Sequence, residues 1–326
     1  MQTDLAQLEP LAGLALSRWG LDDAVLSMLS HSENTMFLVT PREASRAFVL
    51  RIHRPFYHSL NGIRSELAWS RALQADAGVK TPQAIPGLDG ELIQTVEHPD
   101  LRGSRNCVLF EFIDGAEPDQ NNLIAPLRQL GAVAARMHAH GRDWTRPRYY
   151  ERLTWDFDHC VGPRAYWGSW RDGPNVDAAG GQMLGRAAAT IENRLRRYGR
   201  APDRYGLVHA DIRLANLLVH NGETRVIDFD DCGESWFMYD AATAVSFIEH
   251  RSDVDELMAA WCEGYRRVGT LSAEDENEIW TFIMMRRLAL LAWIGSHAEA
   301  ATARELAPTY GPQSVDVAER YLSRFG

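Results

Sequence analysis

Residues 207–231, LVHADIRLANLLVHNGETRVIDFDD, place polar and charged side chains at the ends of short apolar runs. Such runs are typical of buried strands, and a charge in a buried position is costly unless it is paired or holds a metal ion. Asp211, Asn216 and Asp228 carry carboxylate or carboxamide oxygens, which are the ligands that magnesium prefers. The stretch therefore indicates a functional site.

His209, Asp211 and Asn216 have the order and spacing of a kinase catalytic loop. In phosphoryl transfer a carboxylate takes the proton of the acceptor hydroxyl, divalent metal bridges the phosphates and a cation neutralises the transferring group. We expect Asp211 to be the base and Arg213 to be the cation. We expect Asn216 and Asp228 to bind Mg2+, and His209 to brace the loop.

The chain between these residues must bring them together. Asp211 and Asp228 are seventeen positions apart, which is enough for a loop, a strand, a turn and a returning strand. This arrangement would bring both carboxylates to one edge, where a metal ion and phosphates would compensate their charge.

The N-terminal part of the chain is expected to be rich in strands. Helical spacing predicts a helix over residues 3–29, and apolar runs at 34–39 and 46–53 predict a hairpin. A helix over 60–77 and strands over 91–96 and 106–113 follow. Beyond them, apolar residues at helical spacing predict helices through 123–137, 184–195 and 254–265, the last with Ser252 as its N-cap.

Two residues of the N-terminal part support the kinase interpretation. Arg51 lies in a predicted strand and Glu66 lies in the following helix, fifteen positions later. Kinases place a lysine and a glutamate in these two elements to hold the α- and β-phosphates. Ser32 and Asn34 precede a predicted strand and would cover the phosphates, although the chain has no G-x-G-x-x-G loop.

The motif resembles a known family. The signature H-[GA]-D-x-x-x-x-N followed by I-D-F-D-D belongs to the aminoglycoside phosphotransferase/choline kinase-like superfamily, and residues 209–231 match it. The segments SENTMF, RIHRP and MRRLALLAW are similar to elements of the bacterial stress-response Ser/Thr kinases. That group and the homoserine kinase type II group look most similar, and the resemblance runs from about residue 26 to residue 293.

The resemblance implies an α+β, protein kinase-like fold of two lobes. A small antiparallel β lobe would cover residues 1–112, and a larger helical lobe would cover residues 113–326. ATP or GTP would bind between the lobes with Mg2+, and Glu111, Phe112 and Ile113 would offer backbone groups to the base. Asp240 matches the family's structural aspartate that braces the catalytic loop.

The chain departs from the family pattern at two positions. Ala210 replaces the commoner glycine. Arg51 replaces lysine, and a planar guanidinium is not equivalent to an ammonium as a phosphate partner. Lys and Arg total 34, and Lys80 is the only lysine, so the second departure follows a bias of the whole chain.

We predict a phosphotransferase that moves the γ-phosphoryl group of ATP or GTP to a hydroxyl of a small molecule, such as an amino alcohol, an amino acid, a sugar or an aminoglycoside-like compound. The alternatives are a stress-response-type protein Ser/Thr kinase and a nucleotide-binding pseudokinase. Asp230 and Asp231 would suit a cationic acceptor. Arg286 or Arg287 could instead hold an acceptor carboxylate.

Composition limits the other classes. The 326 residues carry a net charge of −10, which argues against nucleic acid as a partner. The N-terminal residues have no signal-peptide pattern and the longest apolar run is short, so we expect a cytoplasmic protein without a membrane partner. The four scattered cysteines are expected to be buried thiols. The oligomeric state stays open.

Simpler interpretations exist for several of these residues. Arg51 and Glu66 could form an ordinary surface ion pair. The segment MHAH at 137–140 could cap a helix rather than bind a metal ion. The tryptophan-rich stretch 141–181 could serve packing rather than form a cation cage.

Overall fold

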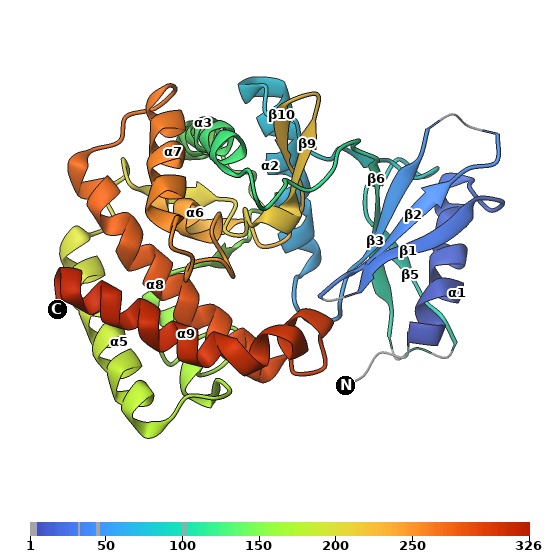
Figure 1. Ribbon diagram of the computed structural model, residues 1–326. Helices are drawn as coiled ribbons and strands as arrows, with labels where there is room; N and C mark the ends of the chain where they lie inside the picture. The colour runs from blue at the N-terminus through green and yellow to red at the C-terminus, as the bar shows by residue number, and fades with distance from the viewer. Residues whose placement is uncertain (1–4, 32, 44–45, 100, 102) are drawn as a thin grey trace. The chain divides into compact units, whose positions relative to one another are not determined.

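The computed structural model describes residues 5–31, 33–43, 46–99, 101 and 103–326. It has a mixed α+β fold, with an antiparallel sheet in the N-terminal part and a helical C-terminal part (Figure 1), as the sequence predicts. The chain divides into two compact units. Unit 1 comprises Met1–Gln74, Lys80–Asp114 and Arg146–Glu151, and unit 2 comprises Ala75–Val79, Gly115–Thr145 and Arg152–Gly326.

Unit 1 is built on a six-stranded antiparallel sheet of order β1-β2-β3-β6-β4, in which β5 also pairs with β6. The elements are α1 (Leu5–Leu16), η1 (Ser17–Trp19), β1 (Val25–His31), β2 (Thr35–Thr40), β3 (Phe48–Ile52), α2 (Leu60–Ala77), β4 (Ala84–Ile85), β5 (Gln94–Val96) and β6 (Arg105–Glu111). The predicted hairpin, now β2 and β3, and the predicted helix α2 are confirmed.

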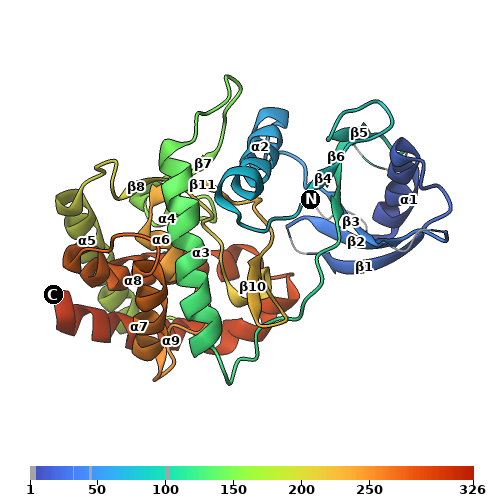
Figure 2. The ribbon, with the colours of Figure 1, turned by 90° about the horizontal axis from the view of Figure 1, so that it is seen from above.

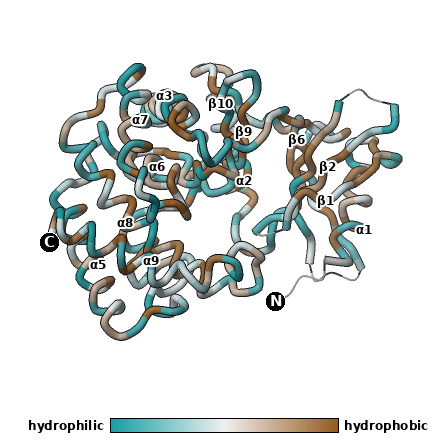
Figure 3. Tube along the Cα trace, viewed as in Figure 1, coloured by the Kyte–Doolittle hydropathy of each residue, from teal (hydrophilic) through white to brown (hydrophobic). Residues whose placement is uncertain are grey.

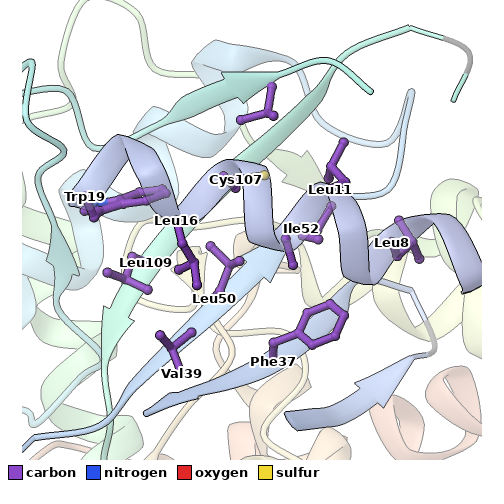
Figure 4. Close-up of a cluster of buried hydrophobic side chains, with 13 residues drawn as sticks. Leu8, Leu11, Leu16, Trp19, Phe37, Val39, Leu50, Ile52, Cys107 and Leu109 are labelled. Carbon is purple, nitrogen blue, oxygen red and sulfur yellow. The ribbon is translucent and has the colours of Figure 1, made fainter. Parts of the chain in front are cut away.

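The helices α1 and α2 cover opposite faces of the sheet. Successive side chains of a strand point to opposite faces. Cys107 and Leu109 of β6 belong to the same buried cluster as Leu11 of α1, Phe37 and Ile52 (Figure 4). Val108 and Phe110 pack instead with Ile63 and Leu67 of α2.

This alternation decides where Arg51 points. In β3, Leu50 and Ile52 belong to the α1 cluster, so Arg51 between them lies on the α2 face. The register agrees, because Arg51 pairs with Val108 of β6. A charged residue in a central strand is thereby directed toward the helix that carries Glu66.

The prediction of one helix over residues 3–29 is wrong. The helix α1 ends at Leu16, and Val25–His31 form the edge strand β1. Six of the seven residues of β1 are exposed, so the strand lacks the alternation of buried and exposed residues that would reveal it.

Unit 2 is mainly helical. Its helices are α3 (Ile124–Asp143), α4 (Phe157–Cys160), η2 (Trp170–Asp172), α5 (Ala178–Tyr198), η3 (Leu214–Asn216), α6 (Met238–Thr243), α7 (Val254–Arg266), α8 (Ala273–Ser296) and α9 (Ala301–Phe325) (Figures 1 and 2). The predicted helices through 123–137, 184–195 and 254–265 correspond to α3, α5 and α7. The N-cap of α7 is Asp253 rather than the predicted Ser252.

Glycines let α3 and α7 approach each other closely. A Cβ atom at Gly131 would lie 2.0 Å from the carbonyl oxygen of Trp261, and a Cβ atom at Gly264 would lie 1.7 Å from that of Arg128. Both separations are far below van der Waals contact, so only glycine fits at these two positions.

The helix α8 lies in the core of unit 2. Ser272 and Asp275 form a capping box at its N-terminus, where Ser272 Oγ accepts from the Asp275 amide at 3.0 Å. In the described part of the chain α8 alone is long and apolar enough to cross a membrane (Figure 3 colours the residues by hydropathy). Of its most apolar window, 89% is buried inside the protein.

Short strands flank the candidate loop. The strands β9 (Leu217–His220) and β10 (Glu223–Val226) form a hairpin whose turn residues, Asn221 and Gly222, have φ of 50° and 76°. A two-residue Asn-Gly turn favours such angles. The strands β7 (Leu153–Thr154), β11 (Gly233–Trp236) and β8 (Tyr205–Val208) form a second small sheet. The candidate loop thus lies between β8 and β9, and Asp228 follows β10.

The four cysteines are free and buried, as predicted. Burial raises the pKa of the thiols of Cys107, Cys160 and Cys262 to about 12, so these three stay protonated near neutral pH.

Candidate functional site

Asp240 holds the start of the loop 209–216 through hydrogen bonds to its backbone. Its carboxylate accepts the backbone amide of His209 at 3.1 Å and that of Ala210 at 2.7 Å. His138 of α3 lies 3.0 Å from the same carboxylate and 3.1 Å from the hydroxyl of Tyr265. Asp240 is fully buried, so these groups replace the water that would otherwise solvate it.

His209 connects the loop to the segment that carries Asp228. Its Nε2 lies 3.2 Å from the carbonyl oxygen of Ile227, and its ring lies 4.5 Å from the ring of Phe229. The amide of Ile227 donates to the carbonyl oxygen of Asn216 at 3.0 Å. The residues on both sides of Asp228 are therefore tied to the loop that holds Asp211.

The Asp211 carboxylate accepts hydrogen bonds at both oxygens. Asn216 Nδ2 donates to Oδ2 at 2.8 Å, and Arg213 Nε approaches the same oxygen at 3.3 Å. Arg286 Nη2 of α8 donates to Oδ1. The side chain of Asp211 is 15% exposed, so its carboxylate is held by buried partners and still reaches solvent.

Two residues of the site have left-handed backbone angles. Ala210 has a φ of 66° and Asp228 has a φ of 62°. Glycine adopts such angles without strain, which is the physical reason why glycine suits position 210. Residues held in this region often belong to functional sites, because the surrounding structure must enforce the strained angle.

The residues present fit a divalent metal ion. Asn216 uses its amide nitrogen on Asp211, at 2.9 Å from the carbonyl oxygen and 2.8 Å from Oδ2. Among the described residues no donor faces its carboxamide oxygen, which is thereby left to serve as a ligand. Asp228 is exposed and directly follows Ile227, which is hydrogen-bonded to the loop 209–216. Oxygen donors of this kind suit Mg2+ or Ca2+.

In unit 1, Arg51 and Glu66 form a buried ion pair. Arg51 Nη2 lies 2.6 Å from Oε1 and 2.7 Å from Oε2 of Glu66, and both side chains are 2% exposed. The guanidinium also lies 4.8 Å from the centre of the Phe110 ring. The interpretation as a surface ion pair is therefore wrong. The pair occupies the two elements predicted for it, β3 and α2.

We expect Glu66→Ala to lower the free energy of unfolding by about 3–5 kcal/mol, because it leaves the Arg51 charge buried without its carboxylate. Chemical denaturation followed by circular dichroism measures the change. The control is Glu192→Ala in α5, which breaks an exposed pair with Arg196 and should cost at most about 1 kcal/mol. Equal losses in the two variants would contradict the expectation.

The other predicted nucleotide residues are only partly open to a ligand. Ser32 lies outside the described residues. Asn34 is buried, and its carboxamide oxygen accepts the amide of Arg54 at 3.1 Å. The amide of Glu111 donates to Gln83 at 2.9 Å, and that of Phe112 donates to Ala47 at 3.3 Å. The amides of Glu111 and Phe112 therefore already donate to carbonyl oxygens of the protein and are not free to contact a nucleotide base.

The sequence suggests Arg286 or Arg287 as the partner of an acceptor carboxylate, and Arg287 does not fit that role. Its side chain is fully buried, with Nη1 2.7 Å from Glu249 and Nε 2.8 Å from Ser314. Arg286 is also buried, and it contacts Asp211 instead of facing solvent. Asp230 and Asp231 lie in the turn before β11, where Asp230 is buried and Asp231 is partly exposed.

The sequence alone did not reveal His138, Tyr265 or Thr243. Thr243 Oγ1 accepts the amide of Ile212 at 3.1 Å and so holds the middle of the loop. His138 belongs to the segment MHAH, but it braces Asp240 and is not part of a metal cluster among the described residues. His140 of the same segment lies in the last turn of α3, as the helix-end interpretation predicts. The packing interpretation of the tryptophan-rich stretch is confirmed for Trp155 and Trp170, which are 0% and 3% exposed.

The known proteins that this chain resembles are phosphotransferases and kinases. The model of the phosphotransferase enzyme family matches residues 27–271. The amicoumacin kinase of Bacillus subtilis (strain 168) is 25% identical over 295 residues, which cover 86% of this chain and 83% of that protein. The solved structure of the microcompartment-associated aminopropanol kinase is 42% identical, with a TM-score of 0.89 and 98% of each chain covered.

A second solved structure shares the fold. It is an amicoumacin kinase in complex with AMP-PNP, Ca2+ and Ami, and it is 19% identical with a TM-score of 0.75. The match covers 96% of this chain and 94% of that one.

Proposed function

The chain belongs to the phosphotransferase enzyme family, and on that premise we propose that its acceptor is the hydroxyl of a small amino alcohol such as an aminopropanol. The coarser function follows from the family and its relatives. The protein is a small-molecule kinase that phosphorylates a hydroxyl group. ATP is the donor that we propose, with Mg2+ as the metal ion.

One observation carries the choice of acceptor: the 42% identity, over 98% of both chains, to an aminopropanol kinase. Charge supports it. An amino alcohol is a cation at neutral pH, and the turn that follows Asp228 carries the further carboxylates Asp230 and Asp231. Carboxylates near the acceptor would favour an ammonium group over a neutral alcohol.

In the proposed reaction Asp211 orients the acceptor hydroxyl and accepts its proton. The acceptor oxygen forms a bond to the γ-phosphorus of ATP, the bond to the β,γ-bridging oxygen breaks, and ADP leaves. Asn216 and Asp228 would hold the metal ion, which when bound neutralises charge on the phosphates. Arg213, whose side chain is 33% exposed, would add positive charge beside the transferring group.

Residues of unit 1 would bind the nucleotide. The Arg51–Glu66 pair replaces the lysine–glutamate pair of kinases, and the carbonyl groups at 111–112 and the Ile113 amide are the proposed contacts to the base. The four free, buried cysteines suit a reducing compartment, and we propose the cytoplasm as the location.

The test is a panel of matched acceptors with the purified protein and Mg·ATP. The panel contains 1-amino-2-propanol, 3-amino-1-propanol, 2-propanol, free serine and a generic unfolded protein, and ADP formation gives kcat/KM for each. We expect an aminopropanol to exceed 2-propanol by at least about 100-fold, because the alcohol lacks the ammonium group. Equal values for the amine and the alcohol would contradict the proposed acceptor. A preference for the protein would favour the less supported protein kinase.

A further inference from the structure

The first observation concerns the lone pairs of the Asp211 carboxylate. Each carboxylate oxygen can accept about two hydrogen bonds. Oδ2 accepts from Asn216 Nδ2 at 2.8 Å and from Arg213 Nε at 3.3 Å. Oδ1 accepts from Arg286 Nη2 alone among the described residues. The open acceptor position of the base is therefore on Oδ1, the oxygen that Arg286 holds.

The second observation concerns the way in which Arg286 is itself held. Its side chain is 1% exposed. Nε donates to Ser246 Oγ at 3.1 Å, and Nη1 lies 3.4 Å from the hydroxyl of Tyr239. The guanidinium carbon lies 5.2 Å from the centre of the Trp167 ring. A planar guanidinium with separate partners for its nitrogens has one orientation, so the Nη2–Oδ1 contact is fixed.

The neighbouring arginine shows that this arrangement is specific. Arg286 and Arg287 are adjacent on α8 and both are buried, but consecutive helical residues point about 100° apart. Arg287 pairs with Glu249 and with Ser314 of α9, and among the described residues no hydrogen bond or ion pair joins it to the loop 209–216. One guanidinium stabilises the helical core, and the other reaches the base.

We propose that Arg286 is a positioning residue of the phosphoryl-transfer reaction. Anchored by Ser246 and Tyr239, it fixes the plane of the Asp211 carboxylate so that the second lone pair of Oδ1 faces the acceptor hydroxyl. Arg286 does not contact the substrate; it acts through Asp211. The inference rests on the proposed function of Asp211 as the base and adds the group that orients it.

The test is a double-mutant cycle on kcat with Asp211→Asn, Arg286→Lys and the double variant, using the acceptor preferred in the panel. Arg286→Lys keeps the positive charge but loses the planar guanidinium with its several donors. We expect kcat to fall about 10- to 100-fold, because Asp211 would be displaced and a displaced catalytic group loses activity on that scale. KM for both substrates should change less than about threefold, since ground-state binding is untouched. In the double variant the loss should not exceed that of Asp211→Asn alone, because Arg286 acts only through that carboxylate.

Arg287→Lys is the matched control. It changes a buried, ion-paired arginine on the same helix, so it should lower Tm while kcat per folded protein stays within about twofold. Ser246→Ala is the second variant, in case Arg286→Lys does not fold. It loosens the guanidinium without removing it, and its smaller loss of kcat should also vanish in the Asp211→Asn background.

The outcomes separate the two proposals. Wild-type kcat in both folded Arg286→Lys and Ser246→Ala, or losses that add to that of Asp211→Asn, would overturn the positioning role alone. Wild-type kcat in Asp211→Asn would overturn the proposed base, and the positioning role with it.

Discussion

Asp211→Asn is expected to lower kcat by about 10²- to 10⁴-fold, the usual contribution of a positioned base. Asparagine keeps the shape of the side chain but cannot take the acceptor proton. Some stability should be lost, because the buried Arg286 loses its charged partner. The fold should survive, because asparagine keeps an oxygen that can accept from Arg286, and Asp240 and Thr243 hold the loop by its backbone. Initial rates of ADP formation at saturating substrates measure the loss.

The control for this variant is Glu223→Gln. Glu223 pairs with Arg225 on the hairpin β9–β10 and is 50% exposed, so its charge lies near the site in sequence but is largely screened by solvent. Its kcat should equal that of the wild type. An Asp211→Asn protein that is folded and fully active would remove Asp211 from the reaction.

Asp240→Ala is expected to lower the free energy of unfolding by about 3–5 kcal/mol and to abolish most activity. The variant leaves two buried amides, those of His209 and Ala210, without their acceptor. It also removes the carboxylate beside His138. These amides belong to the residues directly before Asp211. Without the Asp240 carboxylate, Asp211 should therefore no longer be held in its position, and activity should be lost.

A graded control accompanies this prediction. Thr243→Val removes one acceptor, that of the Ile212 amide, and should cost about 1–3 kcal/mol, less than Asp240→Ala. Urea denaturation and kcat are measured on both variants. A loss of stability in Asp240→Ala no larger than that in Thr243→Val would contradict the role of Asp240 as the main brace.

Local patterns predict the parts of this protein whose causes are local. An element with one buried face shows a regular spacing of apolar residues in the sequence. This is the case for the hairpin of β2 and β3 and for the helices α2, α3, α5 and α7. The spacing of His209, Asp211 and Asn216 is also local, because one loop between β8 and β9 carries all three residues.

The remaining features depend on contacts that no local pattern encodes. His138 and Asp240 are 102 positions apart, and Asp211 and Arg286 are 75 apart. The helix α8 is buried on nearly all sides, so it has no polar face that would show which way Arg286 or Arg287 points. The edge strand β1 is exposed on both faces and was therefore mistaken for the end of a helix.

The most direct test of the central claim is 31P NMR of the purified protein with ATP, Mg2+ and 1-amino-2-propanol. The central claim is that Asp211, with a metal ion at Asn216 and Asp228, transfers the γ-phosphoryl group to the hydroxyl of an amino alcohol. We expect a phosphomonoester signal to grow in step with ADP, to grow at least about 100-fold more slowly with Asp211→Asn, and to be absent without a divalent ion. ATP consumption that yields only inorganic phosphate, or a phosphomonoester that forms equally well with Asp211→Asn, would contradict the claim.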